Sequence, residues 1–224
     1  MSRFRTTARV LVLVTVLGTA AGLLAGTTAQ AQIPAFAAAS RVTPPKAEQV
    51  AVFAGGCFWG VDAVFKHVKG VSSVVSGYAG GGAATARYGV VSTGTTGHAE
   101  SVKITYDPSQ ISYSDLLRVF FSVAHDPTQL NRQGPDVGSQ YRSAIFYANE
   151  TERATAQAYI DQLNKGGVFS GPIVTQVASF GHFYPAEDYH QNYLALHPDQ
   201  PYIVFNDLPK VRRLQQQFPT LYKP

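Results

Sequence analysis

The stretch from Val50 to Gly70 places the strongest constraint on the fold. Val50 to Ala54 is a short apolar run that two glycines stop, as is typical of a buried strand. Beyond the glycines, apolar side chains recur at helical spacing up to Gly70, namely Phe58, Val61, Phe65 and Val68. The sequence therefore predicts a strand, a tight turn and a helix, with Cys57 where the turn becomes the helix.

The remainder of the chain mixes strand and helix patterns without strict alternation. Strands are expected over 71–78, 99–106, 140–147 and 173–179, helices over 112–124, 151–164, 186–196 and 207–218, and loops over 80–97 and 126–139. Hydrophobic residues make up 45% of the sequence, enough for a real core. We predict an α+β fold, with helices packed mainly on one side of a mixed central sheet.

The first 31 residues have the pattern of a secretory signal peptide. Three arginines and no acidic residue accompany a mostly apolar run over 10–26, and Ala29-Gln30-Ala31 offers a cleavage site. An uncleaved membrane anchor is the alternative, because the run is about long enough to span a bilayer. We expect a signal peptide over 1–31, a flexible linker over 32–47 and one catalytic domain over 48–224. The mature protein would be exported, either periplasmic or secreted, and would meet a membrane only through the signal peptide.

The charge gives no sign of nucleic-acid binding. The chain has 18 basic and 14 acidic residues, and three of the basic residues, Arg3, Arg5 and Arg9, lie in the expected signal peptide. The remainder is nearly neutral and lacks a basic block interleaved with aromatic residues. One cysteine and six histidines show no metal-ligand spacing, so we expect no metal site and no cofactor.

Cys57 is the only cysteine of the chain. In an exported protein a lone cysteine indicates an intermolecular bond or a reactive thiol, with a buried inert thiol as the alternative. At the start of a helix, free backbone N–H groups and the helix dipole favour an anion, so we expect a stabilised thiolate. Phe58 lies on the apolar stripe of that helix, which predicts a core position for part of its ring. Trp59 lies off the stripe, which favours a surface or pocket position.

Glu100 is a carboxyl residue on the apolar face of a predicted strand. The alternation over 99–106 places it on the same face as Val102 and Ile104. A core-facing carboxyl should have a raised pKa and could donate a proton near neutral pH. The alternative is that this end of the strand is already in water.

Several segments together resemble one known family. Residues 56–60, Gly-Cys-Phe-Trp-Gly, and 97–100, Gly-His-Ala-Glu, resemble signature segments of the A-class methionine sulfoxide reductases, as do residues 125–129, 138–143 and 183–191. The likeness extends over about residues 50–205, which is most of the expected domain. It implies a two-layer, ferredoxin-like sandwich and the reduction of methionine S-sulfoxide, free or in oxidised proteins.

The resemblance also implies a role for each matching residue. Cys57 would be the nucleophile and Glu100 the proton donor to the sulfoxide oxygen. Of the others, Tyr88 and Tyr141 would hydrogen-bond that oxygen, Phe58 and Trp59 would hold the S-methyl group, and Asp136 would order the polar side of the pocket. His190 and Glu187 lie in a matching segment and are expected to support the site without taking part in the chemistry.

The chain departs from many relatives in its C-terminal tail, where they carry further cysteines. Residues 206–224 contain none, so an intramolecular disulfide is impossible. After turnover Cys57 would be a sulfenic acid, and an external thiol would have to reduce it. We expect a thioredoxin-like protein or a small thiol as this reductant.

Two other functions fit parts of the sequence. A cysteine hydrolase would pair Cys57 with a histidine, and His98, His182 and His190 are available. An exported peptide-binding module would use the aromatic residues while Cys57 stays inert. The reactivity of Cys57 separates this module from either enzyme.

Overall fold

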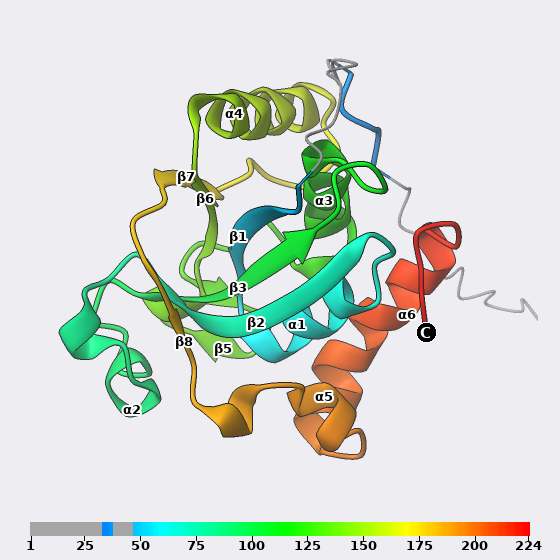
Figure 1. Ribbon diagram of the computed structural model, residues 1–224. Coiled ribbons are helices and arrows are strands. Elements are labelled where there is room, and N and C mark those ends of the chain that lie inside the picture. The colour runs from blue at the N-terminus through cyan, green and yellow to red at the C-terminus, as the bar shows by residue number, and fades with distance from the viewer. Residues whose placement is uncertain (1–32, 38–46) are drawn as a thin grey trace, which may run out of the picture. The chain divides into compact units, whose positions relative to one another are not determined.

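A six-stranded sheet organises the part of the chain that the computed structural model describes, residues 33–37 and 47–224 (Figure 1). The strand order is β7-β6-β1-β3-β2-β8, and every neighbouring pair is antiparallel except β6 and β7. The strands are β1 (Gln49–Gly55), β2 (Val71–Ala79), β3 (Ala99–Tyr106), β6 (Ser143–Tyr147), β7 (Gln176–Ser179) and β8 (Phe183–Pro185). The expected signal peptide and most of the expected linker lie outside the described residues.

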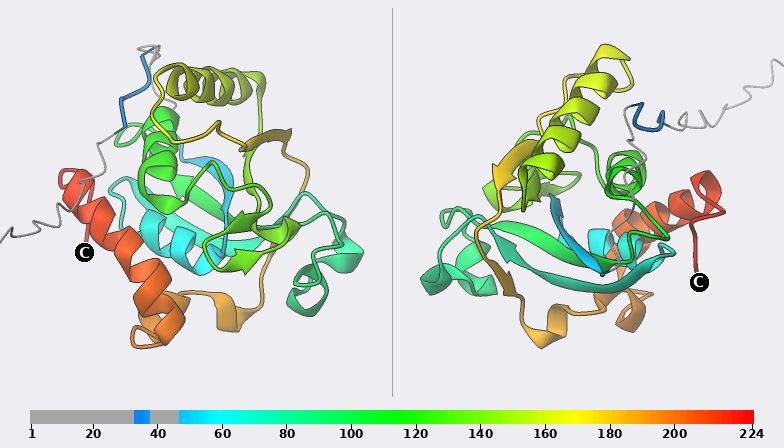
Figure 2. Two further views of the ribbon diagram at one scale, coloured as in Figure 1. Left: turned by 180° about the vertical axis from the view of Figure 1, so that it is seen from behind. Right: turned by 45° about the horizontal axis from the view of Figure 1, so that its top comes forward.

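The main helices cover one face of this sheet. Seen from behind, α1, α3 and α6 lie in front of the strands (Figure 2). These helices, with α4, bury one large apolar cluster against the sheet, which includes Phe53, Phe65, Ile104 and Phe120. The helices are α1 (Phe58–Lys66), α2 (Tyr88–Val91), α3 (Tyr113–Val119), α4 (Glu150–Lys165), α5 (Tyr193–Leu196) and α6 (Leu208–Gln217). The prediction of an α+β fold with a mixed sheet and helices packed on it is confirmed.

The opposite face of the sheet carries a smaller apolar cluster of short side chains around Phe146. The chain between β7 and β8 packs on it through Phe180 and Phe183. This connection has only three residues between strands at opposite edges, so it spans at most about 14 Å. A flat six-stranded sheet would be roughly 24 Å wide. The sheet must therefore curl and bring its two edges together.

Short elements fill the regions expected to be loops. A 3-10 turn, η1 (Ala83–Thr85), and α2 lie in the first, and a two-stranded hairpin of β4 (Arg132–Gln133) and β5 (Asp136–Val137) lies in the second. Ser112 and Asp115 form a capping box at α3, and a π-helical turn, η2 (Phe120–Ala124), continues that helix. The expected strand over 140–147 begins only at Ser143, because η3 (Ser139–Tyr141) occupies its first residues. No helix in the described part is long and apolar enough to cross a membrane.

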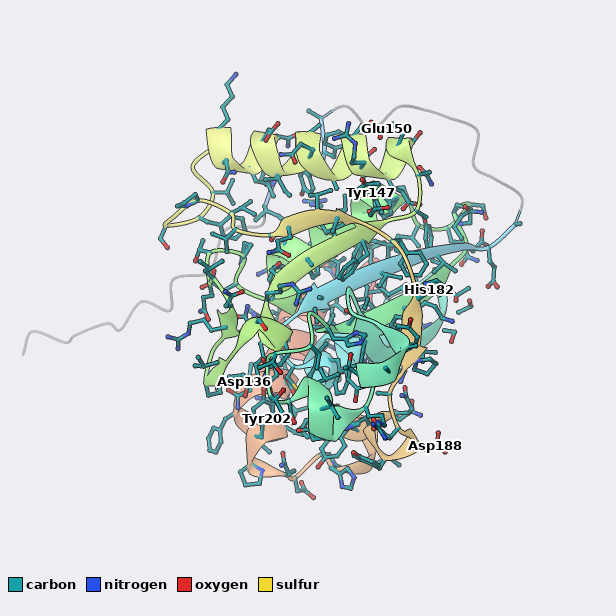
Figure 3. All side chains as sticks on the ribbon, turned by 90° about the vertical axis from the view of Figure 1, so that its left-hand side faces the viewer. Asp136, Tyr147, Glu150, His182, Asp188 and Tyr202 are labelled. Atoms are coloured by element: carbon teal, nitrogen blue, oxygen red, sulfur yellow. The ribbon has the colours of Figure 1, made fainter. Side chains whose placement is uncertain are left out.

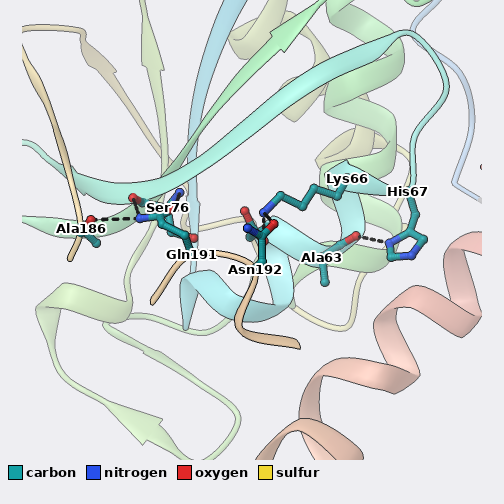
Figure 4. Close-up of polar contacts among 8 residues, drawn as sticks. Ala63, Lys66, His67, Ser76, Ala186, Gln191 and Asn192 are labelled. Atoms are coloured by element: carbon teal, nitrogen blue, oxygen red, sulfur yellow. Dashed lines mark hydrogen bonds and ion pairs between the residues drawn. The ribbon is translucent and has the colours of Figure 1, made fainter. Parts of the chain in front are cut away.

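The helix expected over 186–196 is wrong. Two short pieces, η4 (Asp188–His190) and α5, replace it, and Asn192 between them has a left-handed φ of 56°. The side chain of Gln191 causes the break, because it pairs with both backbone groups of Ser76 on β2, accepting from the N–H and donating to the carbonyl at 3.0 Å each. Lys66 donates to Asn192 at 2.7 Å (Figure 4). The segment is thus fixed to β2 and α1 instead of to itself.

Residues 33–37, part of the expected linker, pack on α3 and α4. Ile33 is buried in the main core, and Phe36 lies edge-on to Tyr159. Four hydrogen bonds hold the segment, from Arg118 to the Ile33 carbonyl, from Tyr159 to the Pro34 carbonyl, and between the amide of Gln162 and the backbone of Ala35 and Ala37. These five residues therefore behave as part of the domain and not as a free linker.

Candidate active site

Cys57 lies at the N-cap of α1, directly after the turn that leaves β1. Gly56 has a φ of +88°, and a side chain there would collide with Gln133, so the turn requires glycine. The predicted strand, turn and helix are confirmed. Cys57 is 8% exposed, so its sulfur lies below the surface.

The expectation of a stabilised thiolate is not met in the resting site. Burial and the nearby carboxyl groups of Glu100 and Asp207 raise the pKa of Cys57 well above its usual range. The backbone N–H of Trp59 and the charge of Lys210 lower this pKa, but their effects are weaker. The start of the helix does favour the anion, as predicted, yet loss of solvent around the sulfur outweighs it.

Glu100 is buried beside the same turn of α1. It is 2% exposed, so the alternative of a wet strand end is wrong. The backbone N–H of Phe58 donates to Glu100 Oε2 at 3.0 Å, which holds the carboxyl next to the residue that follows Cys57. Burial raises the pKa of Glu100 to about 8, against the smaller lowering effect of this hydrogen bond. Glu100 therefore keeps its proton at neutral pH.

An aromatic wall follows Cys57. Phe58 is fully buried, and its ring centre lies 5.0 Å from that of His190. Trp59 is partly exposed and stacks flat on Tyr193, with ring centres 3.6 Å apart. Its indole N–H donates to Nδ1 of His190 at 3.2 Å. The different placement of the two rings agrees with the prediction from helical spacing.

Tyr88 and Tyr141 belong to two short elements, α2 and η3. Burial is the main reason that the pKa of each phenol is raised, and the charges of Glu100 and Cys57 raise both further. Each tyrosine therefore lies close enough for the charges of these two groups to affect its pKa. Its hydroxyl stays protonated at neutral pH and can donate a hydrogen bond. The structure thus brings together four residues predicted from separate segments.

Glu187 and His190 connect the site to its surroundings. Glu187 accepts hydrogen bonds of 2.9 Å from the Tyr78 hydroxyl and from the backbone N–H of Tyr88. The His190 ring lies 4.5 Å from that of Tyr88 and, as described above, bonds Trp59. These contacts match the supporting role expected for both residues.

Asp136, the last predicted site residue, has a partner that the sequence did not indicate. The hydroxyl of Tyr202 donates a short hydrogen bond to Asp136 Oδ2, and Figure 3 shows the two side chains next to each other. Tyr202 also meets Trp59 edge-on, with ring centres 5.9 Å apart. Tyr202 precedes η5 (Ile203–Asp207), a π-helical turn before α6. Nothing in its sequence neighbourhood distinguishes it from the other eleven of the twelve tyrosines.

The other proposed chemistries find less support in this geometry. None of the hydrogen bonds found in the described part of the chain joins Cys57 to a histidine, as a cysteine hydrolase would need. His98 bonds the Gly82 carbonyl at 3.0 Å and His190 bonds Trp59. No group of three metal-ligating side chains occurs among residues 33–37 and 47–224.

Comparison with known proteins finds relatives that match most of the chain. The family model for peptide methionine sulfoxide reductase matches residues 49–221. The chain is 62% identical over 174 residues to peptide methionine sulfoxide reductase MsrA 2 of Mesorhizobium japonicum, covering 78% of this chain and 89% of that protein. It is 54% identical over 176 residues to MsrA 2 of Synechocystis, covering 79% and 82%.

Two solved structures have a similar fold. Methionine sulfoxide reductase A of Corynebacterium diphtheriae has a TM-score of 0.58 and 36% identity, with 70% of this chain and 77% of that chain covered. Reduced Mxr1 of Saccharomyces cerevisiae has a TM-score of 0.61 and 32% identity, with 69% and 88% covered. The resemblance drawn from the sequence segments is confirmed, and the chain belongs to the peptide methionine sulfoxide reductase family.

Proposed function

We propose that this protein reduces methionine S-sulfoxide to methionine, free and in oxidised proteins, with Cys57 as the nucleophile. The observation that carries the proposal is the pairing at the start of α1. The Phe58 N–H holds a protonated Glu100 beside Cys57, and Tyr88 and Tyr141 lie near enough for Glu100 and Cys57 to raise their pKa values. A nucleophile and a proton donor are thereby presented to one reacting centre.

The reaction uses these groups in a defined order. The Cys57 sulfur attacks the electrophilic sulfur of the sulfoxide while Glu100 gives its proton to the sulfoxide oxygen. Tyr88 and Tyr141 stabilise the charge on that oxygen by hydrogen bonds. The attack forms a transient bond between the two sulfurs, and the S–O bond of the substrate breaks. The released hydroxide then attacks the Cys57 sulfur, the bond between the two sulfurs breaks, and methionine leaves with Cys57 as a sulfenic acid. The substrate sulfur gains two electrons and Cys57 loses two; the proton from Glu100 ends on the transferred oxygen, and the proton of the Cys57 thiol restores Glu100.

The raised pKa of Glu100 serves this chemistry in two ways. A protonated carboxyl can donate, and it adds no negative charge beside the sulfur when Cys57 ionises. The aromatic wall of Phe58 and Trp59 gives the S-methyl group of the substrate an apolar surface to contact. The hydrogen-bonded pair of Asp136 and Tyr202 lies beside Trp59 and supplies polar groups on that side of the site.

Regeneration of Cys57 requires a thiol from outside the chain. Cys57 is the only cysteine of the sequence, so its sulfenic acid has no internal partner. A thioredoxin-like protein or a small thiol is the reductant that we propose. The signal-like first 31 residues support export as the setting, with the mature protein periplasmic or secreted.

Mass spectrometry with racemic methionine sulfoxide tests the proposed reaction directly. We expect the mature protein to gain one oxygen at Cys57 while one methionine forms, and the S epimer to be consumed while the R epimer remains. Cys57→Ser, the matched control, should form no methionine. Consumption of the R epimer alone would refute the assignment. A Cys57 that neither gains oxygen nor reacts with iodoacetamide would favour the peptide-binding module.

A further inference from the structure

A buried ion pair lies behind the first turn of α1. Lys210 Nζ, on α6, lies 3.1 Å from Oδ1 of Asp207, the last residue of η5. Asp207 is completely buried and Lys210 nearly so. Burying two charges costs solvation free energy, and apolar residues of the same size often stabilise a fold better. The position of this pair therefore calls for a reason other than stability.

Gly60 brings the pair close to the nucleophile. It is the third residue of α1, three positions after Cys57. A side chain at Gly60 would overlap both Oδ1 of Asp207 and Nζ of Lys210. The missing side chain lets both charged groups reach the backbone of the turn that begins at Cys57.

Acidic groups gather at this turn. The N–H of Phe58 bonds Glu100, and Asp207 lies against Gly60. The positive end of the helix attracts both carboxyl groups. The second carboxylate oxygen of Asp207, Oδ2, is buried without a hydrogen-bond partner, so its charge is compensated on one side only. Lys210 adds the compensating positive charge.

The groups that act on Cys57 come from every element around it. Besides the helix itself they are Glu100 on β3, Tyr88 on α2, Tyr141 on η3, Tyr202 before η5, and the pair of Asp207 and Lys210. Burial keeps the tyrosines and Glu100 uncharged at neutral pH. Two nearby histidines are also neutral, because burial lowers the pKa of His125 to about 3 and also lowers that of His190. Asp207 and Lys210 then form the ion pair that lies against the turn at Gly60, while Asp136 is bonded by Tyr202 and Glu187 by Tyr78 and Tyr88.

We propose that Lys210 and Asp207 are positioning residues for Cys57. Lys210 supplies the counter-charge that the thiolate needs, and Asp207 holds Lys210 in place while opposing the ionisation of Cys57. The inference rests on the proposed function only in taking Cys57 as the reacting group. Lys210 thus favours the ionisation of Cys57, and Asp207, its ion-pair partner, opposes it.

The test is the rate of Cys57 alkylation by iodoacetamide as a function of pH. The reaction needs no sulfoxide, and the single cysteine makes its site unambiguous. Lys210→Met should slow alkylation by about tenfold at a given pH, and Asp207→Asn should speed it by about tenfold, since one nearby charge shifts a pKa by about one unit or more. Lys210→Arg keeps the charge and should return the rate toward that of the natural chain.

A second ion pair on the same helix provides matched controls. Asp62 and Lys66 lie 2.8 Å apart on α1, with Asp62 buried. Asp62→Asn and Lys66→Met should leave the pH profile of Cys57 unchanged, even where they change the free energy of unfolding. A merely structural role of Asp207 and Lys210 would make both variants shift the profile in the same direction, or not at all. Either result, or no recovery with Lys210→Arg, would overturn the proposal.

The double variant Asp207→Asn/Lys210→Met keeps the test available if a single variant does not fold. It leaves neither charge of the pair buried alone. Its alkylation should be faster than that of the natural chain, because Asp207 Oδ1 approaches the turn at Gly60 more closely than Lys210 Nζ does. An equal or slower rate would contradict the assignment. Failure of sulfoxide reduction with a normal alkylation pattern would instead contradict the proposed function and leave this inference intact.

Discussion

At the scale of single residues, Glu100 is the group whose chemistry can be isolated most cleanly. It is buried and held by one backbone N–H, so Glu100→Gln should keep the shape of the site while removing the transferable proton. We expect sulfoxide reduction to slow by about two to four powers of ten, the usual range for general acid catalysis. Single-turnover methionine formation measures this step without the reductant. A rate within a few-fold of the natural chain would exclude Glu100 as the proton donor.

The pKa of Glu100 sets the pH dependence of the same step. Because burial raises this pKa to about 8, the carboxyl is protonated below pH 8 and ionised above it. The reaction needs the Glu100 proton and the Cys57 thiolate together, and burial raises the pKa of Cys57 well above its usual range. The single-turnover rate should therefore rise with pH up to about 8 and level off above it, as Glu100 loses its proton. Glu100→Gln cannot titrate, so its much lower rate should keep rising above pH 8 as Cys57 ionises. A break at the same pH in Glu100→Gln would assign it to another group.

The same residues show what the sequence could and could not predict about the site. The alternation along its own strand indicated a buried position for Glu100 and left a wet strand end as the alternative, and the adjacent glycines indicated the position of Cys57. Both signals are local. The pairing of Tyr202 with Asp136 joins residues 66 positions apart, and the burial of Asp207 depends on a missing side chain on another helix. The sequence pattern of one segment cannot predict contacts with residues that lie far away in the sequence.

At the scale of elements, the helix predicted over 186–196 shows that local patterns do not reveal contacts with distant residues. Its apolar spacing is helical, but Gln191 bonds the backbone of Ser76, 115 positions earlier, and Asn192 takes a left-handed conformation. Tertiary hydrogen bonds here replace those of a helix. By contrast, the strand-turn-helix at Cys57 and the capped start of α3 depend on neighbouring residues, and both were predicted.

The docked segment 33–37 should contribute to stability. Ile33 is buried in the main core, so Ile33→Ala should lower the free energy of unfolding by about 2 kcal/mol. Leu196→Ala, at a side chain that is 65% exposed, is the control and should change it by about 0.5 kcal/mol or less. Urea unfolding followed by fluorescence measures both. Equal, small effects would mean that residues 33–37 add nothing to the fold.

At the scale of the whole molecule, the number of cysteines determines how the enzyme completes its cycle. With Cys57 alone, oxidation of the active site cannot spread to a second thiol of the same chain. The sulfenic acid must wait at a buried position until another molecule reaches it. Exposure to excess peroxide during this wait should carry Cys57 to the sulfinic form and inactivate the enzyme.

Recycling can be tested by trapping the external reductant. Without any thiol, one equivalent of enzyme should form one equivalent of methionine and then stop. With thiol, turnover should depend on thiol concentration and pass through a mixed disulfide at Cys57, since a thiolate displaces the sulfenic oxygen as water. A thioredoxin-like protein that lacks its own resolving cysteine should therefore stay linked to the enzyme on a non-reducing gel. The linked species should require both the sulfoxide and Cys57, with Cys57→Ser as the control. Steady turnover in the complete absence of thiol would show that the sulfenic acid is reduced in some other way.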